Sequence, residues 1–299
     1  MKKTILIGCN GQLGTELTRL WQARPGAPTI DLVGLTHGDI DVTDRGQVAA
    51  AFALLCPDLV INTAGFLRVD ECERVPDQAM LVNGIALKYV AEACAEAGAV
   101  LVHFSTDYVF DGEKGAPYLE DDAVAPVNAY GVSKLAGEHF VRYGLPDDHL
   151  IVRTSGLYGP AGSASKGGNF IETMLRLAAA GKGLKVVDDQ VFSPTYAPDL
   201  AAFVVQLIDA GARGTFHITN AGMTTWHDFA KSAFELAGVR AELQPISTAD
   251  YGAAAPRPKY SVLKNERARS VGLPKPRAWD EALAEYIALP GRVKAIALD

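Results

Sequence analysis

Short apolar runs alternate with segments of helical periodicity through the first half of the chain. Between the first two runs, Leu13, Leu17 and Leu20 recur at helical spacing, and a longer helical segment ends at Gly98. The apolar runs are typical of buried strands, and they lie at residues 4–8, 31–35, 59–63, 100–105 and 150–155. Strands that alternate with helices predict an α/β fold with a doubly wound parallel sheet of the Rossmann type.

The alternation loosens after about residue 156, where stretches rich in glycine and proline separate helical segments at 170–181, 199–210 and 226–237. We therefore expect a dinucleotide-binding domain at residues 1–155 and a smaller carboxyl-terminal substrate lobe at residues 156–299. Some segments of the second part are expected to return strands to the main sheet.

Composition narrows the possible functions. The formal net charge is −7 and no block of basic residues is present, so we expect no binding to nucleic acid. No apolar stretch approaches membrane-spanning length, and the apolar run behind the first two lysines is too short for a secretion signal. A cytoplasmic protein is therefore expected. Its cysteines lack any C-x-x-C pairing and are interpreted as buried thiols of a reducing compartment: Cys9, Cys56, Cys72 and Cys94.

A glycine-rich turn, "GCNGQLG", joins the first predicted strand to the first predicted helix. Its glycines are Gly8, Gly11 and Gly14. A tight turn needs a residue without a Cβ atom, and a second glycine lets backbone N–H groups approach a pyrophosphate. The helix amino terminus then favours the negative charge. In this context the turn predicts dinucleotide binding.

The end of the second strand bears on which dinucleotide is bound. An acidic residue there would bind a ribose hydroxyl and favour NAD. The sequence "GLTHGDID" instead offers Thr36 and His37, which repel a 2′-phosphate less than an aspartate would. NADPH is therefore favoured over NADH, and Asp39 and Ile40 are expected to bracket the adenine.

Two tyrosine–lysine pairs have the same four-residue spacing, Tyr130 with Lys134 in "NAYGVSKLAGE" and Tyr260 with Lys264 in "YSVLK". On a helix, four residues advance by about 400°, so each pair would share one helical face. The first pair follows "STDYVFDG", at the end of a predicted strand, whereas the second follows "APRP" in an irregular region. We therefore predict that the first pair is catalytic and that the second packs at the surface or between lobes.

Proton transfer is the chemistry expected of the first pair. A phenol with a pKa of about 10 is a poor acid–base group at neutral pH, and a neighbouring ammonium group stabilises its phenolate. Ser105 and Thr106 supply hydroxyl groups at the carboxyl end of a strand, where ligands bind in open α/β sheets. The pattern predicts a carbonyl held by a hydroxyl group and protonated by Tyr130.

These motifs together resemble the extended short-chain dehydrogenase/reductases, and among them the dTDP-4-dehydrorhamnose reductase family. The similarity extends over nearly the whole chain. It rests on "GCNGQLG", "NTAGFLRVDECE", "STDYVFDG", "YGVSKLAGE", "RTSGLYG", "GGNFIETMLRLA", "DDQVFSPTYAPDLA", "HITNAG" and "APRPKYSVL".

The resemblance implies reduction of a nucleotide-sugar 4-ketone by NAD(P)H, in the family's reaction dTDP-4-dehydro-L-rhamnose to dTDP-L-rhamnose. It implies catalytic roles for Thr106, Tyr130 and Lys134. The expected substrate contacts are Thr106, Asp107, Gly156 and Asn169. The expected cofactor contacts are Gly8, Gly11, Gln12, Leu13, Gly14, Thr36, Asp39, Ile40, Ala64, Gly65, Phe66, Tyr130 and Lys134. A homodimer is one expected assembly.

Three departures from the family pattern lie near the implied sugar site. Gly156 stands where many members have a tryptophan that contacts the sugar, Arg68 replaces a small residue, and the loop "GPAGSASKGGN" is long. We therefore expect an open pocket at Gly156 and a broad range of ketones. Some members use a bridging Mg²⁺, for which Glu16 is a candidate ligand, although a lone glutamate on a helix is more often solvated. No metal ligand is assigned.

Alternative functions remain at this point, and the first is reduction of another sugar-nucleotide ketone. Related dehydratases need an Asp-Glu pair after the catalytic threonine, and Asp107 is followed here by Tyr108, which counts against dehydration. A 4-epimerase uses the same tyrosine and lysine with tightly held NAD. A further alternative is a non-catalytic NADP-binding protein, because the regulatory subunit of methionine adenosyltransferase resembles this family too.

Overall fold

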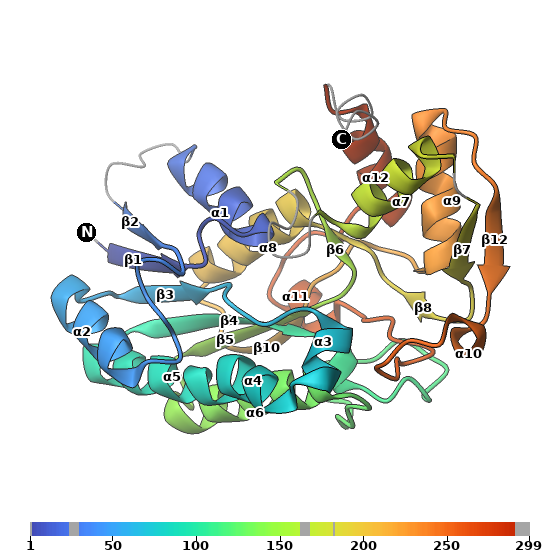
Figure 1. Ribbon diagram of the computed structural model, residues 1–299. Coiled ribbons are helices and arrows are strands. Elements are labelled where there is room, and N and C mark those ends of the chain that lie inside the picture. The colour runs from blue at the N-terminus through green and yellow to red at the C-terminus, as the bar shows by residue number, and fades with distance from the viewer. Residues whose placement is uncertain (1, 24–29, 162–167, 182, 291–299) are drawn as a thin grey trace.

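A six-stranded parallel sheet forms the centre of the larger part of the molecule (Figure 1). The computed structural model describes residues 2–23, 30–161, 168–181 and 183–290. The strand order is β10-β5-β4-β3-β1-β2. The strands are β1 (Lys2–Ile7), β2 (Ile30–Leu35), β3 (Leu59–Asn62), β4 (Val100–Thr106), β5 (His149–Thr154) and β10 (Gly214–His217).

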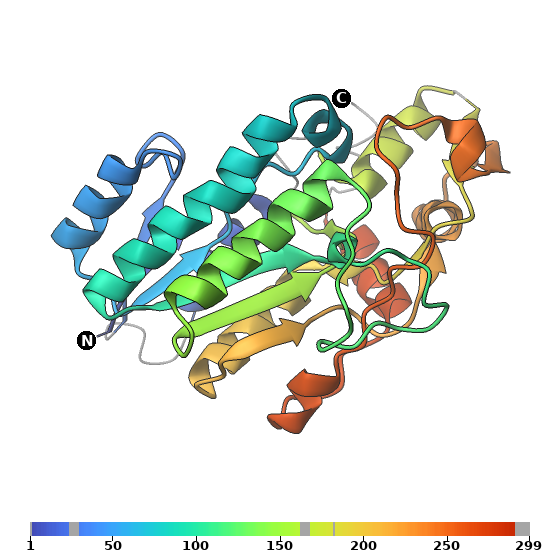
Figure 2. The same ribbon diagram turned by 90° about the horizontal axis from the view of Figure 1, so that it is seen from below.

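Helices cover both faces of this sheet, because successive residues of a strand point to opposite sides. Leu6 and Val102 pack on one face, and their chain neighbours Ile5 and Leu101 pack on the other. The first face is covered by α1 (Gln12–Gln22) and α8 (Ala197–Asp209). The second is covered by α2 (Arg45–Leu55), α5 (Ala86–Ala97) and α6 (Ala129–Gly144), and Figure 2 shows α5 and α6 lying side by side there.

The predicted doubly wound Rossmann-type sheet is confirmed. The chain passes from β1 to its neighbour β2 and then returns to β3 on the other side of β1. Ligands bind at such a reversal, in the crevice beyond the carboxyl ends of the strands. Three short elements connect β3 to α5 near this crevice, namely α3 (Val69–Arg74), α4 (Pro76–Met80) and the π-helical turn η2 (Leu81–Ile85).

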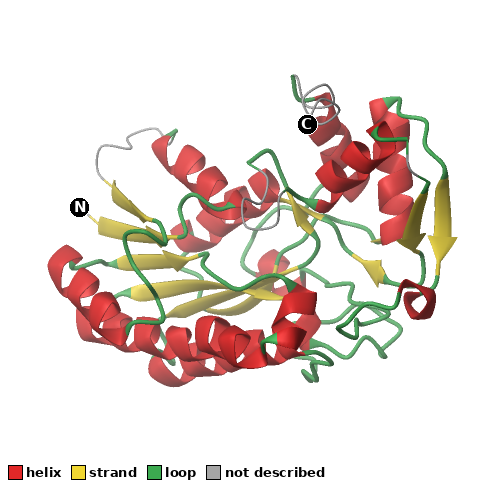
Figure 3. Cartoon of the chain, viewed as in Figure 1, coloured by secondary structure: helices red, strands yellow, loops and turns green. Residues whose placement is uncertain are grey.

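The chain beyond β5 divides between two places. β10 pairs with β5 and α8 packs on α1, so this stretch lies in the larger part. Most of the rest builds a smaller lobe (Figure 3). The core of this lobe is aromatic and includes Tyr158, Phe229 and Tyr286. The elements of the lobe are β6 (Leu157–Tyr158), α7 (Phe170–Ala179), β7 (Leu184–Val187), β8 (Val191–Phe192), β9 (Thr195–Tyr196), β11 (Thr224–Thr225), α9 (Trp226–Ala237), β12 (Leu243–Ile246), α10 (Thr248–Tyr251) and α12 (Trp279–Ala288).

Two ranges named from the sequence fall partly outside the described residues. Positions 162–167 of the loop "GPAGSASKGGN" and positions 291–299 of the expected lobe are not among them. Within the described ranges, no helix combines the length and the apolar character that crossing a membrane requires.

The cysteines are all free thiols. Cys72 and Cys94 are buried and Cys9 is partly buried, but Cys56 is exposed. The prediction of four buried thiols is therefore wrong for Cys56. This residue ends α2 as its C-cap in the left-handed region, with a φ of 44°, in the turn between α2 and β3.

Candidate active site

The glycine loop between β1 and α1 is shaped by close backbone contacts. A Cβ atom on Gly14 would lie 2.2 Å from the carbonyl oxygen of Gly8, so the first turn of α1 rests directly on the loop. Gly8 itself has a φ of 79°, which favours glycine. Gly11 is the N-cap of α1 and provides no side-chain cap. The backbone N–H groups of Gln12 and Leu13 in the first turn therefore have no side-chain acceptor at the N-cap. This cradle fits a pyrophosphate.

A buried asparagine that the sequence analysis did not single out holds the loop after β3, which contains Ala64, Gly65 and Phe66. The backbone N–H of Phe66 donates to Oδ1 of Asn83 at 2.8 Å, and Nδ2 of Asn83 donates to the carbonyl oxygen of Phe66 at 2.9 Å. The same Nδ2 contacts Oγ of Ser133 on α6 at 3.0 Å. Asn83 lies in η2, and π-helical turns are frequent at functional sites.

Asp39, which the sequence analysis placed beside the adenine, holds the turn that follows β2. The backbone N–H and the hydroxyl group of Thr36 donate to Oδ2 of Asp39 at 2.8 and 2.7 Å. These bonds lower the pKa of Asp39. The turn also buries Ile40, whose N–H donates to the Thr36 carbonyl at 3.2 Å. The exposed His37 lies within the same turn, three residues away from the buried Ile40.

β4 and α6 bring the three predicted catalytic residues together. Thr106 is the last residue of β4, and Tyr130 and Lys134 lie one turn apart on α6. The Tyr130 hydroxyl group lies close enough to the Thr106 side chain for the threonine to oppose the rise that burial causes in the Tyr130 pKa. Lys134 is 3% exposed, and its Nζ donates to the carbonyl oxygen of Phe104 at 2.6 Å. The catalytic roles of these residues remain predictions, but the required proximity is present.

Burial changes the pKa of both members of the pair. It raises the pKa of Tyr130, against the opposing effect of the Thr106 side chain. It also lowers the pKa of Lys134 to about 8, against the opposing effect of the Glu138 carboxylate. The expected lowering of the Tyr130 pKa is therefore absent, because loss of hydration outweighs the other contributions. A phenol that keeps its proton is the form that protonates a ketone.

Asp107 is a buried carboxylate on which three parts of the chain converge. It accepts hydrogen bonds from the hydroxyl groups of Thr106 at 3.0 Å and Ser155 at 2.7 Å, and it is also bonded to Ser261. Burial raises its pKa to about 6, and the three hydroxyl groups oppose that rise. The sequence analysis named Asp107 but missed both serines, whose only signal was their place in the motifs "RTS" and "KYS".

The second tyrosine–lysine pair lies in an extended segment. The backbone N–H of Ser261 donates to the carbonyl oxygen of Val191 at 2.8 Å, which aligns this segment with β8. The Tyr260 hydroxyl contacts Sδ of Met223 at 3.5 Å. Lys264 is exposed and its Nζ lies 3.4 Å from a carboxylate oxygen of Glu266. The pair thus forms no joint site.

The expectation of an open pocket at Gly156 is wrong. Gly156 has a φ of 53°, and a Cβ atom there would lie 2.3 Å from the ring of Phe192. That ring stacks on Trp226 with centroids 3.9 Å apart. Phe192 therefore fills the space that a large side chain at position 156 would need. Arg68, another of the departures, is exposed and lies 3.4 Å from a carboxylate oxygen of Glu71.

Asn169 has a structural role at the start of α7. Its Oδ1 accepts the backbone N–H of Glu172 at 3.0 Å, which completes a capping box. Its Nδ2 donates to the Tyr286 hydroxyl at 2.8 Å and to the Gly159 carbonyl at 3.2 Å. Both amide donors are thus already used within the lobe. Contact with substrate at Asn169 remains a prediction, and these bonds count against it.

Glu16 is buried, so the expectation of a solvated glutamate is wrong. It is 4% exposed, and its carboxylate lies 3.0 Å from Nε of Arg19. Among the described residues, one group of three side chains has ligand atoms within 4.8 Å of one another, and Glu16 is not part of it: Asp188, His227 and Asp228. Glu16 therefore belongs to no such group among the described residues, and the use of Mg²⁺ remains a prediction.

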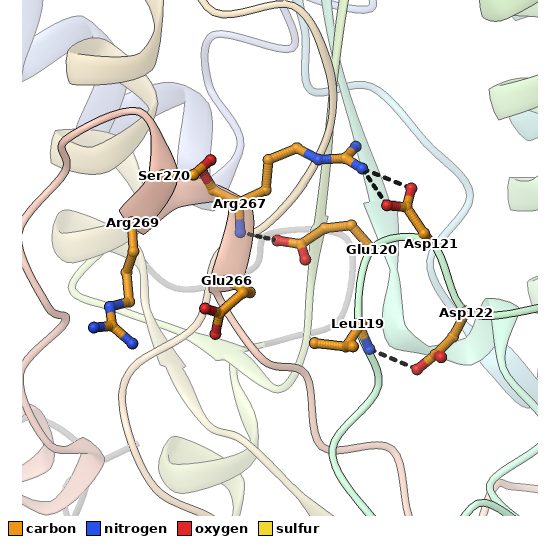
Figure 4. Close-up of a pocket in the computed structure, with 8 residues that line it drawn as sticks. All are labelled: Leu119, Glu120, Asp121, Asp122, Glu266, Arg267, Arg269 and Ser270. Carbon is orange, nitrogen blue, oxygen red and sulfur yellow. Dashed lines mark hydrogen bonds and ion pairs between the residues drawn. The ribbon is translucent and has the colours of Figure 1, made fainter.

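A surface pocket of about 510 Å³ lies away from these residues, at the β10 edge of the sheet (Figure 4). The short helix α11 (Glu266–Ser270) forms one wall and packs against β10. Arg267 binds both carboxylate oxygens of Asp121 at 2.6 and 2.7 Å, and its backbone N–H donates to Glu120. These contacts cover a sheet edge that would otherwise be open to pairing.

Comparison with known proteins agrees with this geometry. A model of the family described as "RmlD substrate binding domain" matches residues 1–290. The dTDP-4-dehydrorhamnose reductase of Streptomyces griseus is 42% identical over 295 residues, which cover 96% of this chain and 94% of the relative. The dTDP-4-keto-6-deoxy-D-glucose reductase of Streptomyces niveus is 39% identical over 286 residues, covering 95% and 96%.

Comparison with a solved structure shows that the similarity extends to the three-dimensional fold. The dTDP-4-dehydrorhamnose reductase of Bacillus anthracis, crystallised in complex with NADP, aligns with a TM-score of 0.89 and 38% sequence identity. The alignment covers 96% of this chain and 99% of that one. The similarity therefore includes both the main sheet and the smaller lobe.

Proposed function

Since the chain belongs to the family described as the RmlD substrate binding domain, we propose that it is an NAD(P)H-dependent reductase of the 4-ketone of a dTDP-linked deoxysugar. The favoured reaction is dTDP-4-dehydro-L-rhamnose to dTDP-L-rhamnose, in line with the name of the Streptomyces griseus relative. NADPH is the favoured cofactor, in line with the NADP of the Bacillus anthracis structure. The meeting of Thr106 at the end of β4 with Tyr130 and Lys134 on α6 carries this proposal.

The residues of the site divide the reaction between them. A bound nicotinamide supplies the hydride. Tyr130 holds a proton, because burial raises its pKa, and gives that proton to the ketone oxygen. Thr106 positions the same oxygen through its hydroxyl group, and Lys134 places a positive charge one helical turn from the phenol. General acid catalysis of this kind contributes typically about 10²–10⁴-fold.

The division of labour along the chain is part of the proposal. Residues 1–155 bind the dinucleotide, and residues 156–299 contribute most contacts to the nucleotide sugar. Asp107 lies at their junction and accepts a hydrogen bond from the substrate. A cytoplasmic location is supported by the four free cysteines. Assembly as a homodimer remains a prediction.

The decisive experiment follows NADPH absorbance with the purified protein and dTDP-4-dehydrorhamnose. We expect consumption of NADPH that depends on the sugar nucleotide and yields one reduced sugar per NADPH. Conversion of a sugar nucleotide without net NADPH loss would instead indicate an epimerase. NADPH binding with no turnover of any dTDP-linked ketone would refute the proposal and leave a cofactor-binding protein.

A further inference from the structure

The segment of residues 255–264, here called the strap, binds both parts of the molecule. On the side of the smaller lobe, the backbone N–H of Val191 donates to the carbonyl oxygen of Lys259 at 2.8 Å. On the side of the larger part, the N–H of Tyr118 donates to the carbonyl oxygen of Val262, also at 2.8 Å. The strap therefore crosses from the lobe to the sheet domain immediately beside the candidate site.

One side chain of the strap makes a bidentate ion pair with the larger part. Nη1 and Nη2 of Arg257 lie 3.2 and 2.8 Å from the two carboxylate oxygens of Asp70, in the first turn of α3. The backbone N–H of Ala255 adds a third bond to the same carboxylate at 3.0 Å. The Arg257 side chain is only 16% exposed, so solvent screens this pair less than an open surface pair.

The same guanidinium group lies near the Tyr108 side chain, and its charge opposes the rise that burial causes in the pKa of that phenol. The Tyr108 ring meets the Tyr130 ring edge to face, with centroids 6.0 Å apart. On its other side, the Tyr108 backbone supports α6, because a Cβ atom on Gly131 would lie 2.2 Å from the Tyr108 carbonyl oxygen. Tyr108 is thus held between Arg257 and the turn of α6 that carries Tyr130.

A second bond ties that turn to the strap. Asn128 is the N-cap of α6, and its Oδ1 accepts the backbone N–H of Gly131 at 2.7 Å. Its Nδ2 donates to the carbonyl oxygen of Pro256, beside Arg257, at 2.8 Å. The start of α6 therefore contacts the strap directly at Asn128 and indirectly through Tyr108.

We propose that Arg257 is a positioning residue, which fixes the Tyr130 ring through Tyr108 and the first turn of α6 when the strap joins the two parts. The inference rests on the proposed function, because proton donation by Tyr130 is what the positioning serves. Arginine suits this role because its planar fork binds a carboxylate with two N–H groups and retains donors for a phenol. A lysine has one ammonium group and would not span both partners in this geometry.

The main test compares Arg257→Met with Arg267→Met. Arg267 is the matched control, because it also makes a long-range bidentate bond to an aspartate, Asp121, but at the β10 edge. We expect Arg257→Met to lower kcat by about 10²-fold, the cost typical of a displacement of about 1 Å near the reacting groups. The dissociation constant for NADPH should remain within about twofold of the wild-type value, a difference that a careful titration can resolve. Arg267→Met should lower thermal stability and leave kcat unchanged.

The conservative variant separates positioning from stability. Arg257→Lys keeps an ion pair with Asp70, so we expect it to recover most of the melting temperature lost in Arg257→Met. Its kcat should stay low, because the shorter lysine side chain does not restore the guanidinium group beside Tyr108. If the kcat of Arg257→Met equals that of the wild type, or if Arg267→Met lowers kcat as much, the proposal is wrong.

A measurement without substrate distinguishes failure of this proposal from failure of the proposed function. Amide hydrogen exchange in residues 105–109 and 128–132 should be faster in Arg257→Met and unchanged in Arg267→Met. A wild-type protein that reduces no dTDP-linked ketone would refute the proposed function, and the exchange result would still decide whether Arg257 holds these two segments. Unchanged exchange in Arg257→Met would refute the positioning role by itself.

Discussion

Two segments of this protein carry a tyrosine four residues before a lysine, and their surroundings differ in every respect that matters for catalysis. Tyr130 and Lys134 lie on α6 beside the end of β4, where Lys134 donates to the carbonyl oxygen of Phe104. Tyr260 and Lys264 lie in the extended strap, where the phenol meets a methionine sulfur and the ammonium group faces an exposed glutamate.

Backbone conformation explains why equal spacing gives unequal chemistry. Four residues advance about 6 Å along a helix and about 13 Å along an extended chain. The helix therefore brings a phenol and an ammonium group to one ligand, and the strap separates them. Burial adds a second difference, because Lys134 is 3% exposed whereas the side chain of Lys264 is 55% exposed. Burial lowers the pKa of Lys134 to about 8.

The largest expected effect is a difference in kcat between variants of the two tyrosines. Tyr130→Phe should reduce kcat by about 10²–10⁴-fold, because the general acid is lost, while NADPH binding changes little. Tyr260→Phe should leave kcat near the wild-type value, because its hydroxyl group contacts only the Met223 sulfur among the described contacts. Steady-state kinetics with a dTDP-linked ketone and a cofactor titration test both variants. A larger loss in Tyr260→Phe would reverse our choice between the pairs.

The lysines should differ in how activity depends on pH. Since burial lowers the pKa of Lys134 to about 8, the ammonium group is lost as pH rises through that value, and kcat/KM of the wild type should fall there. Lys134→Met should lower kcat/KM by about 10²-fold and abolish this alkaline limb. Lys264→Met is the control and should retain both the activity and the limb. A Lys134→Met profile that keeps the limb would assign it to another group.

The sequence sufficed for the first segment because its signals are local. The five predicted strands agree with β1 to β5 to within two residues at each end, and the longer helix ends at Gly98 in the left-handed conformation as its sequence indicated. A glycine loop after a strand and a tyrosine–lysine spacing on a helix depend on neighbours in the chain. These features can therefore be recognised without knowledge of the tertiary structure.

Long-range packing decided what the sequence did not predict. Phe192 fills the space beside Gly156 from a position 36 residues later, as the two residue numbers show, and this contact removes the expected open pocket. Asn83 became part of the site only because a π-helical turn directs it toward Phe66. Ser261 reaches Asp107 from more than 150 residues away along the sequence. No periodic pattern in the sequence indicates such contacts between residues that lie far apart along the chain.

Ser261 adds a further difference between the two segments. The strap contributes this serine to the candidate site, whereas its tyrosine and lysine take no part in the site. The Ser261 hydroxyl group is bonded to Asp107 and opposes the burial that raises the pKa of that carboxyl to about 6. Ser261→Ala should therefore raise the Asp107 pKa further, so the acid limb of kcat/KM should move to higher pH.

We also expect a roughly tenfold loss of kcat/KM at neutral pH in Ser261→Ala, which corresponds to a charged hydrogen bond worth about 1.5 kcal/mol. A pH profile of kcat/KM measures both effects. Ser270→Ala is the control, because the Ser270 hydroxyl group donates only within α11, to the Arg267 carbonyl. An acid limb in Ser261→Ala that coincides with that of the wild type would remove Asp107 from the pH dependence.

The smallest expected effect comes from a substitution at the end of β2, away from both tyrosine–lysine pairs. It tests the choice of cofactor independently of proton transfer. Thr36→Asp would add a second carboxylate beside Asp39, which already accepts two hydrogen bonds from Thr36. Repulsion of a 2′-phosphate at about 4 Å in water is worth about 1 kcal/mol, so the NADPH to NADH ratio of kcat/KM should fall about fivefold. Thr36→Ser keeps the hydroxyl group and should preserve the ratio. Because Tyr130, Lys134 and the strap are untouched, kcat with saturating NADH should stay at the wild-type value. A ratio that does not change in Thr36→Asp would place the discrimination on another residue of the cofactor site.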